Sequence, residues 1–175
     1  NVALELSSDV IVKMDGDGQM SADDLPQLID PLILGEADFT KGNRFRDFKT
    51  LRNMPSIRLW GNAGLTFLVK AATGYWDCID PSNGFLAIRW DILEQIPLEN
   101  IHHSYFFEIS MLSQLYLIEA YVMHIPMQTR YGDEDSHMSI VQILSEFPWR
   151  LGEVLFRRIL LKKFGSLGTQ GVDSK

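Results

Sequence analysis

The sequence predicts an α/β domain, in which strands and helices alternate around one hydrophobic core. The first observation is an apolar, β-branched run, Val10–Val12, which is typical of a strand and is followed by two carboxylates, Asp15 and Asp17. The second is the helical spacing of apolar residues within 25–33 and within 57–72. The third is composition, because 175 residues with 46% hydrophobic and 22% charged side chains suit one globular domain with a core.

Charge and cysteine content narrow the class of protein. The net charge of -7 disfavours a general nucleic-acid binder, so we expect no nucleic-acid partner. Cys78 is the single cysteine, so no disulfide can form within the chain, and a reducing compartment fits. We recognise no signal-peptide pattern in the 175 residues and no apolar run long enough to span a bilayer.

The end of the first predicted strand carries the chemistry. Alternate residues of an extended chain point to the same side, so Asp15 and Asp17 present two carboxylates together. Carboxylate oxygens are hard ligands that suit Mg²⁺ or Mn²⁺. Ligands of open α/β sheets bind outside the C-terminal ends of the strands. We interpret this site as one for a metal bound to the phosphates of a nucleotide.

Two alternatives stay open for these acids. An EF-hand calcium loop also has alternating acids around a glycine, but Lys13 would then stand where its first carboxylate ligand is required. The residues before Lys13 also look like a strand and not like an entering helix. A solvated turn rich in Asp and Gly is the plainer alternative. A non-catalytic calcium-binding or scaffold domain is therefore the competing function of another class.

The other elements follow in chain order. Ser21 is expected to cap a helix over residues 25–33 that Gly35 ends, with Pro31 kinking or shortening its last turn. Residues 42–55 are interpreted as a basic loop, either solvated or anion-binding. The remaining pattern predicts strands over 37–41, 85–89 and 120–126, helices over 57–72, 90–96 and 106–119, a turn at 80–84 and a polar loop over 128–139.

Five ordered stretches of the sequence resemble one family. They are Lys13–Met20 with Asp23–Pro26, Lys41–Arg44, Asp80–Phe85, Phe106–Glu108, and Arg130–Gly132 with Ser136 and His137. Together they resemble family 2 glycosyltransferases of the GT-A fold, most closely the branch with dolichol-phosphate mannosyltransferases and bacterial polyprenyl-phosphate glycosyltransferases. The resemblance runs from about residue 2 to about residue 160.

The resemblance implies a mixed, Rossmann-like sheet flanked by helices, of which this chain is the C-terminal portion. Family members have further elements upstream that bind the base and ribose of the nucleotide, so we expect the chain alone to be inactive. Residues 1–146 would form the C-terminal part of the catalytic domain, residues 147–164 a basic and apolar helix, and residues 165–175 a flexible tail.

The implied reaction is metal-dependent, inverting transfer of a sugar from a nucleoside-diphosphate sugar to a polyprenyl phosphate, with Mg²⁺ or Mn²⁺. The resemblance assigns the catalytic roles to Asp17, Asp80 and Glu108, the phosphate-binding roles to Arg44, Arg130 and His137, and the metal to Asp15, Asp17 and Gln19. Related enzymes often have Lys at the position of His137. The enzyme alternative is a sugar-hydroxyl acceptor, with Glu108 as the base that deprotonates it.

The segment over residues 147–164 has two interpretations. Its cations and apolar residues fit a helix at a membrane surface, with Trp and Phe embedded and cations on lipid headgroups. The alternative is a helix that packs on the upstream half of the catalytic domain, which this chain lacks, or on another subunit of a homo-oligomer. The resemblance favours the membrane, and it places the expected site of action at the cytoplasmic face, by peripheral contact or through segments outside this chain.

Overall fold

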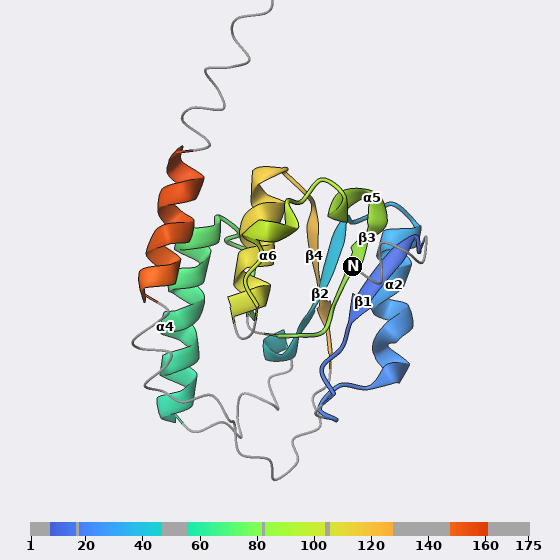
Figure 1. Cartoon of the computed structure of the whole chain (residues 1–175). Coiled ribbons are helices and arrows are strands. Elements are labelled where there is room, and N and C mark those ends of the chain that lie inside the picture. Colours follow the sequence, from blue (N-terminus) through green and yellow to red (C-terminus); the bar gives the residue numbers. More distant parts are fainter. Residues whose placement is uncertain are drawn as a thin grey trace, which may run out of the picture.

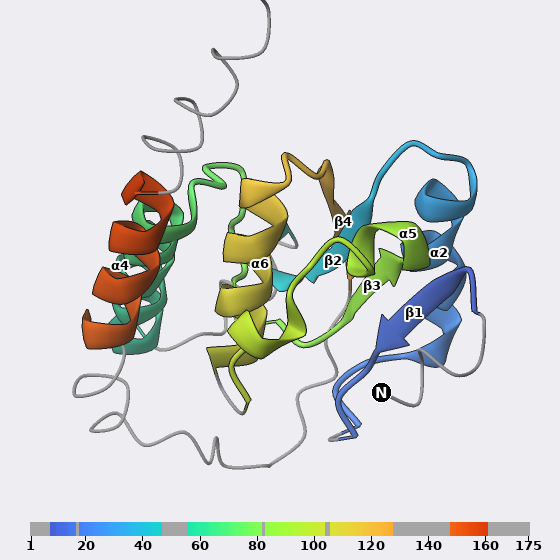
Figure 2. The same ribbon diagram turned by 45° about the horizontal axis from the view of Figure 1, so that its top comes forward.

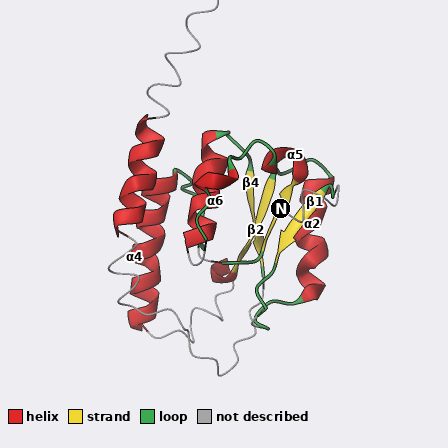
Figure 3. Cartoon of the chain, in the orientation of Figure 1, coloured by secondary structure: helices red, strands yellow, loops and turns green. Residues whose placement is uncertain are grey.

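The computed structural model describes residues 8–16, 18–46, 56–81, 83–103, 106–127 and 148–160. These residues form a four-stranded mixed sheet with helices on both of its faces (Figures 1 and 3). The strands are β1 (Val10–Lys13), β2 (Phe39–Asn43), β3 (Leu86–Arg89) and β4 (Val122–Pro126). The helices and 3₁₀ turns are η1 (Ala22–Asp24), α2 (Leu25–Ile33), η2 (Arg44–Arg46), α4 (Ser56–Thr73), α5 (Trp90–Leu93), η3 (Leu98–Asn100), α6 (Phe107–Leu117) and a helix over 148–160.

The topology of the sheet decides which loops meet. The strand order is β1-β3-β2-β4; β3 is antiparallel to β1 and β2, and β2 is parallel to β4. The C-terminal ends of β1, β2 and β4 therefore lie at the same edge as the N-terminal end of β3. The sequence did not reveal this order, because it follows from pairing between residues far apart in the chain.

Alternation along β3 divides the core between two faces of the sheet. Phe85 and Ala87 pack against Leu28 and Leu32 of α2. Their neighbours Leu86 and Ile88 pack on the opposite face, in a cluster that contains Phe39 of β2 and three residues of α6, namely Met111, Leu112 and Leu115. Because both faces of the sheet are covered, the three buried residues of β3, Leu86–Ile88, are all apolar, and Arg89 at the end of the strand is half-buried.

The predicted strands and helices are present, with small shifts at their ends, whereas the polar loop predicted over 128–139 and the tail predicted over 165–175 lie outside the described residues. The helix over 25–33 is confirmed as α2, and the hydroxyl of Ser21 caps the preceding η1 by accepting a hydrogen bond from the Asp23 N–H at 3.3 Å. The strand predicted over 37–41 begins and ends two residues later, since its parallel ladder with β4 continues through Asn43. The helix predicted over 90–96 ends at Leu93.

A third layer lies outside α6. There α4 and the helix over 148–160 run side by side (Figures 1 and 2). Val69 and Ala72 of α4, Ile109 of α6 and Leu151 and Val154 of the last helix share one buried cluster. None of the helices in the described ranges is long and apolar enough to cross a membrane.

The helix over 148–160 has two apolar faces. The inner face packs as described above. The outer face carries Trp149, which is 81% exposed, together with exposed Phe156, Ile159 and Leu160. These four residues recur at helical spacing, and we call them the outer stripe. Two apolar faces explain why the sequence did not show a clean amphipathic pattern in this segment.

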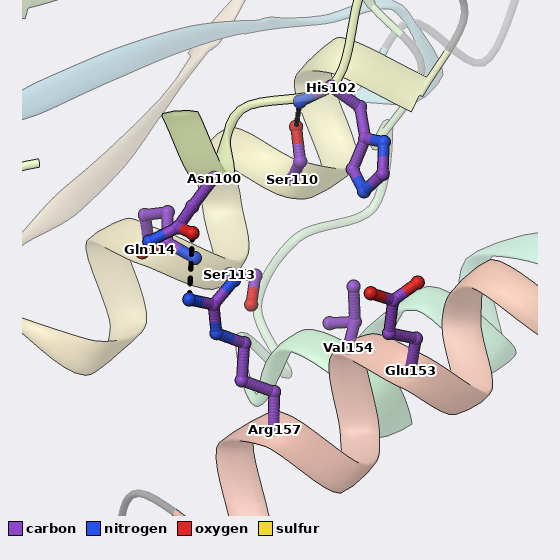
Figure 4. Close-up of a pocket in the computed structure, with 8 residues that line it drawn as sticks. All are labelled: Asn100, His102, Ser110, Ser113, Gln114, Glu153, Val154 and Arg157. Atoms are coloured by element: carbon purple, nitrogen blue, oxygen red, sulfur yellow. Dashed lines mark hydrogen bonds between the residues drawn. The ribbon is translucent and has the colours of Figure 1, made fainter. Parts of the chain in front are cut away.

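Three arginines of this helix contact the protein itself. Arg150 lies over the Phe106 ring at 5.8 Å, and Arg158 over the Tyr116 ring at 5.4 Å. Arg157 donates to Asn100 Oδ1 at 2.7 Å. Figure 4 shows that last bond beside a small pocket between α6 and the helix, lined by Ser110, Ser113, Gln114, Glu153 and Val154 among others. These arginines therefore help to dock the helix.

Candidate active site at the C-terminal edge of the sheet

The sheet edge defined above brings together three predicted site residues. Asp15 follows β1, Arg44 follows β2, and Asp80 begins the turn that leads into β3. A fourth, Glu108, lies in the first turn of α6. Loops at this edge carry side chains from several elements, so the geometry of the site depends on a few polar contacts between them.

Lys13 joins Asp15 to Glu108. Its Nζ donates to Asp15 Oδ1 at 2.6 Å and to Glu108 Oε1 at 3.0 Å. The side chain of Asp15 is 42% exposed and that of Glu108 only 10%. Partial burial works to lower the pKa of Lys13, but its hydrogen bonds to Asp15 and Glu108 outweigh burial and raise that pKa. The ammonium group therefore stays charged between the two carboxylates.

Arg44 and Asp80 form a bidentate pair. The Arg44 Nε donates to Asp80 Oδ2 and its Nη2 to Oδ1, both at 2.8 Å, and the Arg44 backbone N–H donates to Oδ2 at 3.1 Å. The side chain of Asp80 is completely buried. Burial alone would raise the pKa of Asp80, but the hydrogen bonds and charge of Arg44 lower it. A charged, buried Asp80 holds the plane of the Arg44 guanidinium in one orientation.

Beneath this pair, Lys41 supports the turn from inside the protein. Lys41 lies on β2, is fully buried, and donates through its Nζ to the carbonyl of Asn83. The Asn83 amide nitrogen donates to Asp80 Oδ2 at 3.2 Å, and its Oδ1 accepts from the Phe85 N–H at 2.9 Å. Burial lowers the pKa of Lys41. The turn before β3 is thus fixed at both ends and in its middle.

Gly84 connects the two groups of contacts. A Cβ added at residue 84 would overlap the Asp15 carboxylate, so only glycine lets that carboxylate lie against the turn. Glu108, Lys13, Asp15, Gly84, Asn83, Asp80 and Arg44 therefore form one continuous chain of contacts across the sheet edge.

The sequence of the chain is similar to those of two known archaeal proteins. No family model matches the chain. Over 92 residues, or 53% of its length, the chain is 36% identical to the UDP-N-acetylglucosamine–dolichyl-phosphate N-acetylglucosaminyltransferase of Methanococcus voltae, of which this covers 36%. It is 26% identical over 164 residues, 93% of its length, to an uncharacterized protein of Methanocaldococcus jannaschii, covering 64% of that protein. The chain therefore spans less than two thirds of the length of either relative.

The solved structures decide the fold. Glucosyl-3-phosphoglycerate synthase of Mycobacterium tuberculosis matches with a TM-score of 0.59 at 18% identity, over 88% of this chain and 51% of the synthase. The synthase bound to Mn²⁺, UDP-glucose and phosphoglyceric acid matches with a TM-score of 0.54 at 17% identity. The chain has the GT-A glycosyltransferase fold. The predicted fold class is confirmed.

In this GT-A domain, the predicted site residues divide into two groups. Asp15, Arg44, Asp80 and Glu108 are brought together, as described above. Gln19 follows β1 and is half-buried. The other three, Asp17, Arg130 and His137, lie outside the described residues, and their roles stay predictions.

A divalent metal fits the donor chemistry of Asp15. Its carboxylate is a hard oxygen ligand, stands at the strand end and is partly open to solvent. Mg²⁺ is usually held by one or two carboxylates together with substrate phosphates, so a large protein cluster is not required. Within the described ranges, no three His, Cys, Asp or Glu side chains gather as a metal site. Solved structures of the synthase contain Mn²⁺ or Mg²⁺ together with a uridine diphosphate ligand.

The sequence interpretation missed the roles of two lysines. Lys13 precedes Asp15 by two residues, so period-two alternation already placed both on one side of β1. Lys41 is an ionisable residue inside a predicted strand, which is a signal for a buried polar partner. The identities of those partners, Glu108 and Asn83, depend on tertiary contacts that a single sequence does not show.

Proposed function

We propose that the complete protein is a metal-dependent, inverting glycosyltransferase that transfers a sugar from a nucleoside-diphosphate sugar to a polyprenyl phosphate. The observation that carries the proposal is the arrangement of Asp15, Arg44 and Glu108 at one sheet edge of a GT-A fold. The acceptor class is supported by the Methanococcus relative, whose name specifies dolichyl phosphate.

The residues of the site suit an anionic acceptor. A phosphate acceptor is already charged at neutral pH, so it needs cationic positioning more than a strong base. Arg44, with its guanidinium held by Asp80, would supply that positioning, and Asp80 would act through Arg44. Asp15, Asp17 and Gln19 would hold the divalent cation, which neutralises charge that develops on the departing nucleoside diphosphate.

A lipid acceptor also implies that the reaction takes place at a membrane surface. We propose that this surface is the cytoplasmic face of the membrane. The outer stripe supports this, because Trp149 and Phe156 expose large aromatic rings. Arg150, Arg157 and Arg158 contact other residues of the protein. We therefore propose that the outer stripe makes the contact with lipid.

The test is steady-state transfer by the complete protein with Mn²⁺, UDP-sugars and a short-chain polyprenyl phosphate, each substrate varied separately. Arg44→Lys should raise the acceptor KM or slow transfer by about 5- to 150-fold, because lysine cannot reproduce the bidentate fork. Donor affinity should stay nearly unchanged. Arg89→Lys is the matched control, since Arg89 pairs with Asp91 at the opposite end of β3.

The enzyme alternative makes a different prediction. If the acceptor is a sugar hydroxyl, Glu108 must take its proton, and Glu108→Gln should abolish transfer instead of weakening binding. Acceptor kinetics that do not change in Arg44→Lys, together with loss of turnover in Glu108→Gln, would replace the phosphate acceptor with a hydroxyl.

A further inference from the structure

Lys13 has an arrangement that the proposed reaction does not explain. Its ammonium group lies between carboxylates of two different elements, at 2.6 Å from Asp15 Oδ1 and 3.0 Å from Glu108 Oε1. The Phe107 ring centroid lies 5.6 Å from the same nitrogen. Two carboxylates and an aromatic ring form a compact cation site, and a lysine of the chain itself fills it.

The position of this lysine matters for a metal. Asp15 is the described carboxylate best placed to bind a divalent cation, and Lys13 already uses one of its oxygens. A divalent ion at Asp15 would lie within a few ångströms of the ammonium charge, and like charges at such separations repel. A metal that arrives with a diphosphate brings negative charge that offsets the repulsion, whereas a free metal ion does not.

We propose that Lys13 is a positioning residue that takes the place of the divalent cation beside Asp15 and Glu108 and weakens the binding of free metal. The site then favours the metal–diphosphate complex over the metal alone. This inference rests on the proposed function, because it assumes that Asp15 is a metal ligand. It adds a residue and a selectivity that neither the sequence resemblance nor the comparisons assign.

The experiment measures Mn²⁺ binding to the 175-residue chain without nucleotide, by electron paramagnetic resonance of the free ion. Lys13→Met keeps the length of the side chain and removes its charge, and should bind Mn²⁺ about tenfold more tightly than the wild type. Lys13→Arg keeps the charge and should restore an affinity within about threefold of the wild type. Lys70→Met removes a positive charge from α4, outside the site, and should change nothing.

Two further variants make the result decisive. Asp15→Asn in the Lys13→Met background should abolish the gain, because the added affinity must act through Asp15. Lys13→Gln also removes the charge and should likewise tighten Mn²⁺ binding. It replaces Lys13→Met if circular dichroism shows that Lys13→Met does not fold.

Each outcome has a defined meaning. Tighter binding in the charge-removing variants that depends on Asp15 and is reversed in Lys13→Arg supports the role of Lys13. If the wild type binds Mn²⁺ through Asp15 but Lys13→Met binds it no more tightly, the role of Lys13 is overturned. The proposed function is not affected by that result. Absence of binding in both proteins overturns the role of Lys13 and also the metal assignment of Asp15, which the transfer assay with Asp15→Asn then checks separately.

Discussion

Lys13 and Lys41 lie on neighbouring parts of the same sheet edge, yet they respond to their surroundings in opposite directions. Lys13 is partly exposed and pairs with two carboxylates, which raise its pKa. Lys41 is completely buried and donates to the neutral carbonyl of Asn83, and burial lowers its pKa. Partners outweigh burial at Lys13, whereas burial outweighs the neighbouring charges at Lys41.

The comparison separates two kinds of polar contact in one site. The inner contacts of Lys41, Asn83, Asp80 and Arg44 fix the turn before β3 within the folded protein. The outer contacts of Lys13 adjust charge where a ligand would bind. Substitutions of the fully buried members Lys41, Asn83 and Asp80 should therefore change stability most, and substitutions in the outer group should mainly change binding.

Asp80→Asn should have the largest effect. It removes the charge of a fully buried carboxylate and leaves the partly buried guanidinium of Arg44 facing a neutral amide, while Lys41 loses a nearby carboxylate. We expect the free energy of unfolding to fall by about 3–5 kcal/mol, the usual cost of removing one partner from a buried ion pair. Urea-induced unfolding, followed by circular dichroism, measures the loss.

The control for Asp80 is Asp91→Asn. Asp91 also receives two hydrogen bonds from one arginine, Arg89, but its side chain is 56% exposed. Its substitution should cost at most about 1 kcal/mol, as is usual for surface pairs. Equal losses in the two variants would show that burial does not distinguish the inner contacts from ordinary surface pairs.

Gly84→Ala should have a smaller effect on stability and a clear effect on binding. The new methyl group must displace the Asp15 carboxylate, which is partly exposed and can rotate toward solvent. We expect unfolding to become easier by about 1 kcal/mol, at the low end for overpacking. Displacement of the Asp15 carboxylate from its place at the sheet edge should weaken Mn²⁺ binding by about tenfold if Asp15 is a ligand.

Gly16→Ala provides the matched control for Gly84→Ala. Gly16 lies one residue beyond Asp15, and an added Cβ there would meet no atom within 4 Å. The control should retain both stability and Mn²⁺ affinity. If Gly16→Ala weakens binding as much as Gly84→Ala, the effect comes from the loop around Asp15 and not from its packing against the turn.

The sequence predicted the elements of this fold better than their arrangement. Apolar periodicity located α2 at its observed bounds, because local spacing determines which face of a helix is buried. The end of β2 was missed by two residues, because the ladder with β4 sets it. The antiparallel direction of β3 and the packing of the helix over 148–160 on α4 also depend on contacts between distant residues.

The candidate site was predictable in the same uneven way. The spacing and types of residues, with the family resemblance, identified Asp15, Arg44, Asp80 and Glu108, which the structure brings to one edge. The pairing of Arg44 with Asp80 was not foreseen, because the two residues lie 36 positions apart. Asp80 is observed as the buried partner of Arg44, a tertiary contact that the sequence does not show, and its catalytic role stays a prediction.

The last prediction concerns pH and distinguishes the two lysines directly. Because the folded protein lowers the pKa of Lys41 below its ordinary value of 10.5, the unfolded chain binds more protons at this site in the window below 10.5. Wild-type stability should therefore rise relative to Lys41→Met as pH increases from neutral toward 10.5. Lys13 has a raised pKa, so its stabilising contribution is fully present below 10.5 and is lost only as pH rises above it.

Urea unfolding of the wild type, Lys41→Met and Lys13→Met across this pH range measures both differences. The charged and titratable groups near Lys41 are Cys78, Asp80, Glu108, Arg44 and His124, and they are common to all three proteins. Between neutral pH and 10.5, the difference in free energy of unfolding between wild type and Lys41→Met should change with pH. Over the same range, the difference between wild type and Lys13→Met should stay constant. A constant difference for Lys41→Met would mean that the attraction of Asp80 and Glu108 cancels the cost of burial, and the contrast between inner and outer contacts would then disappear.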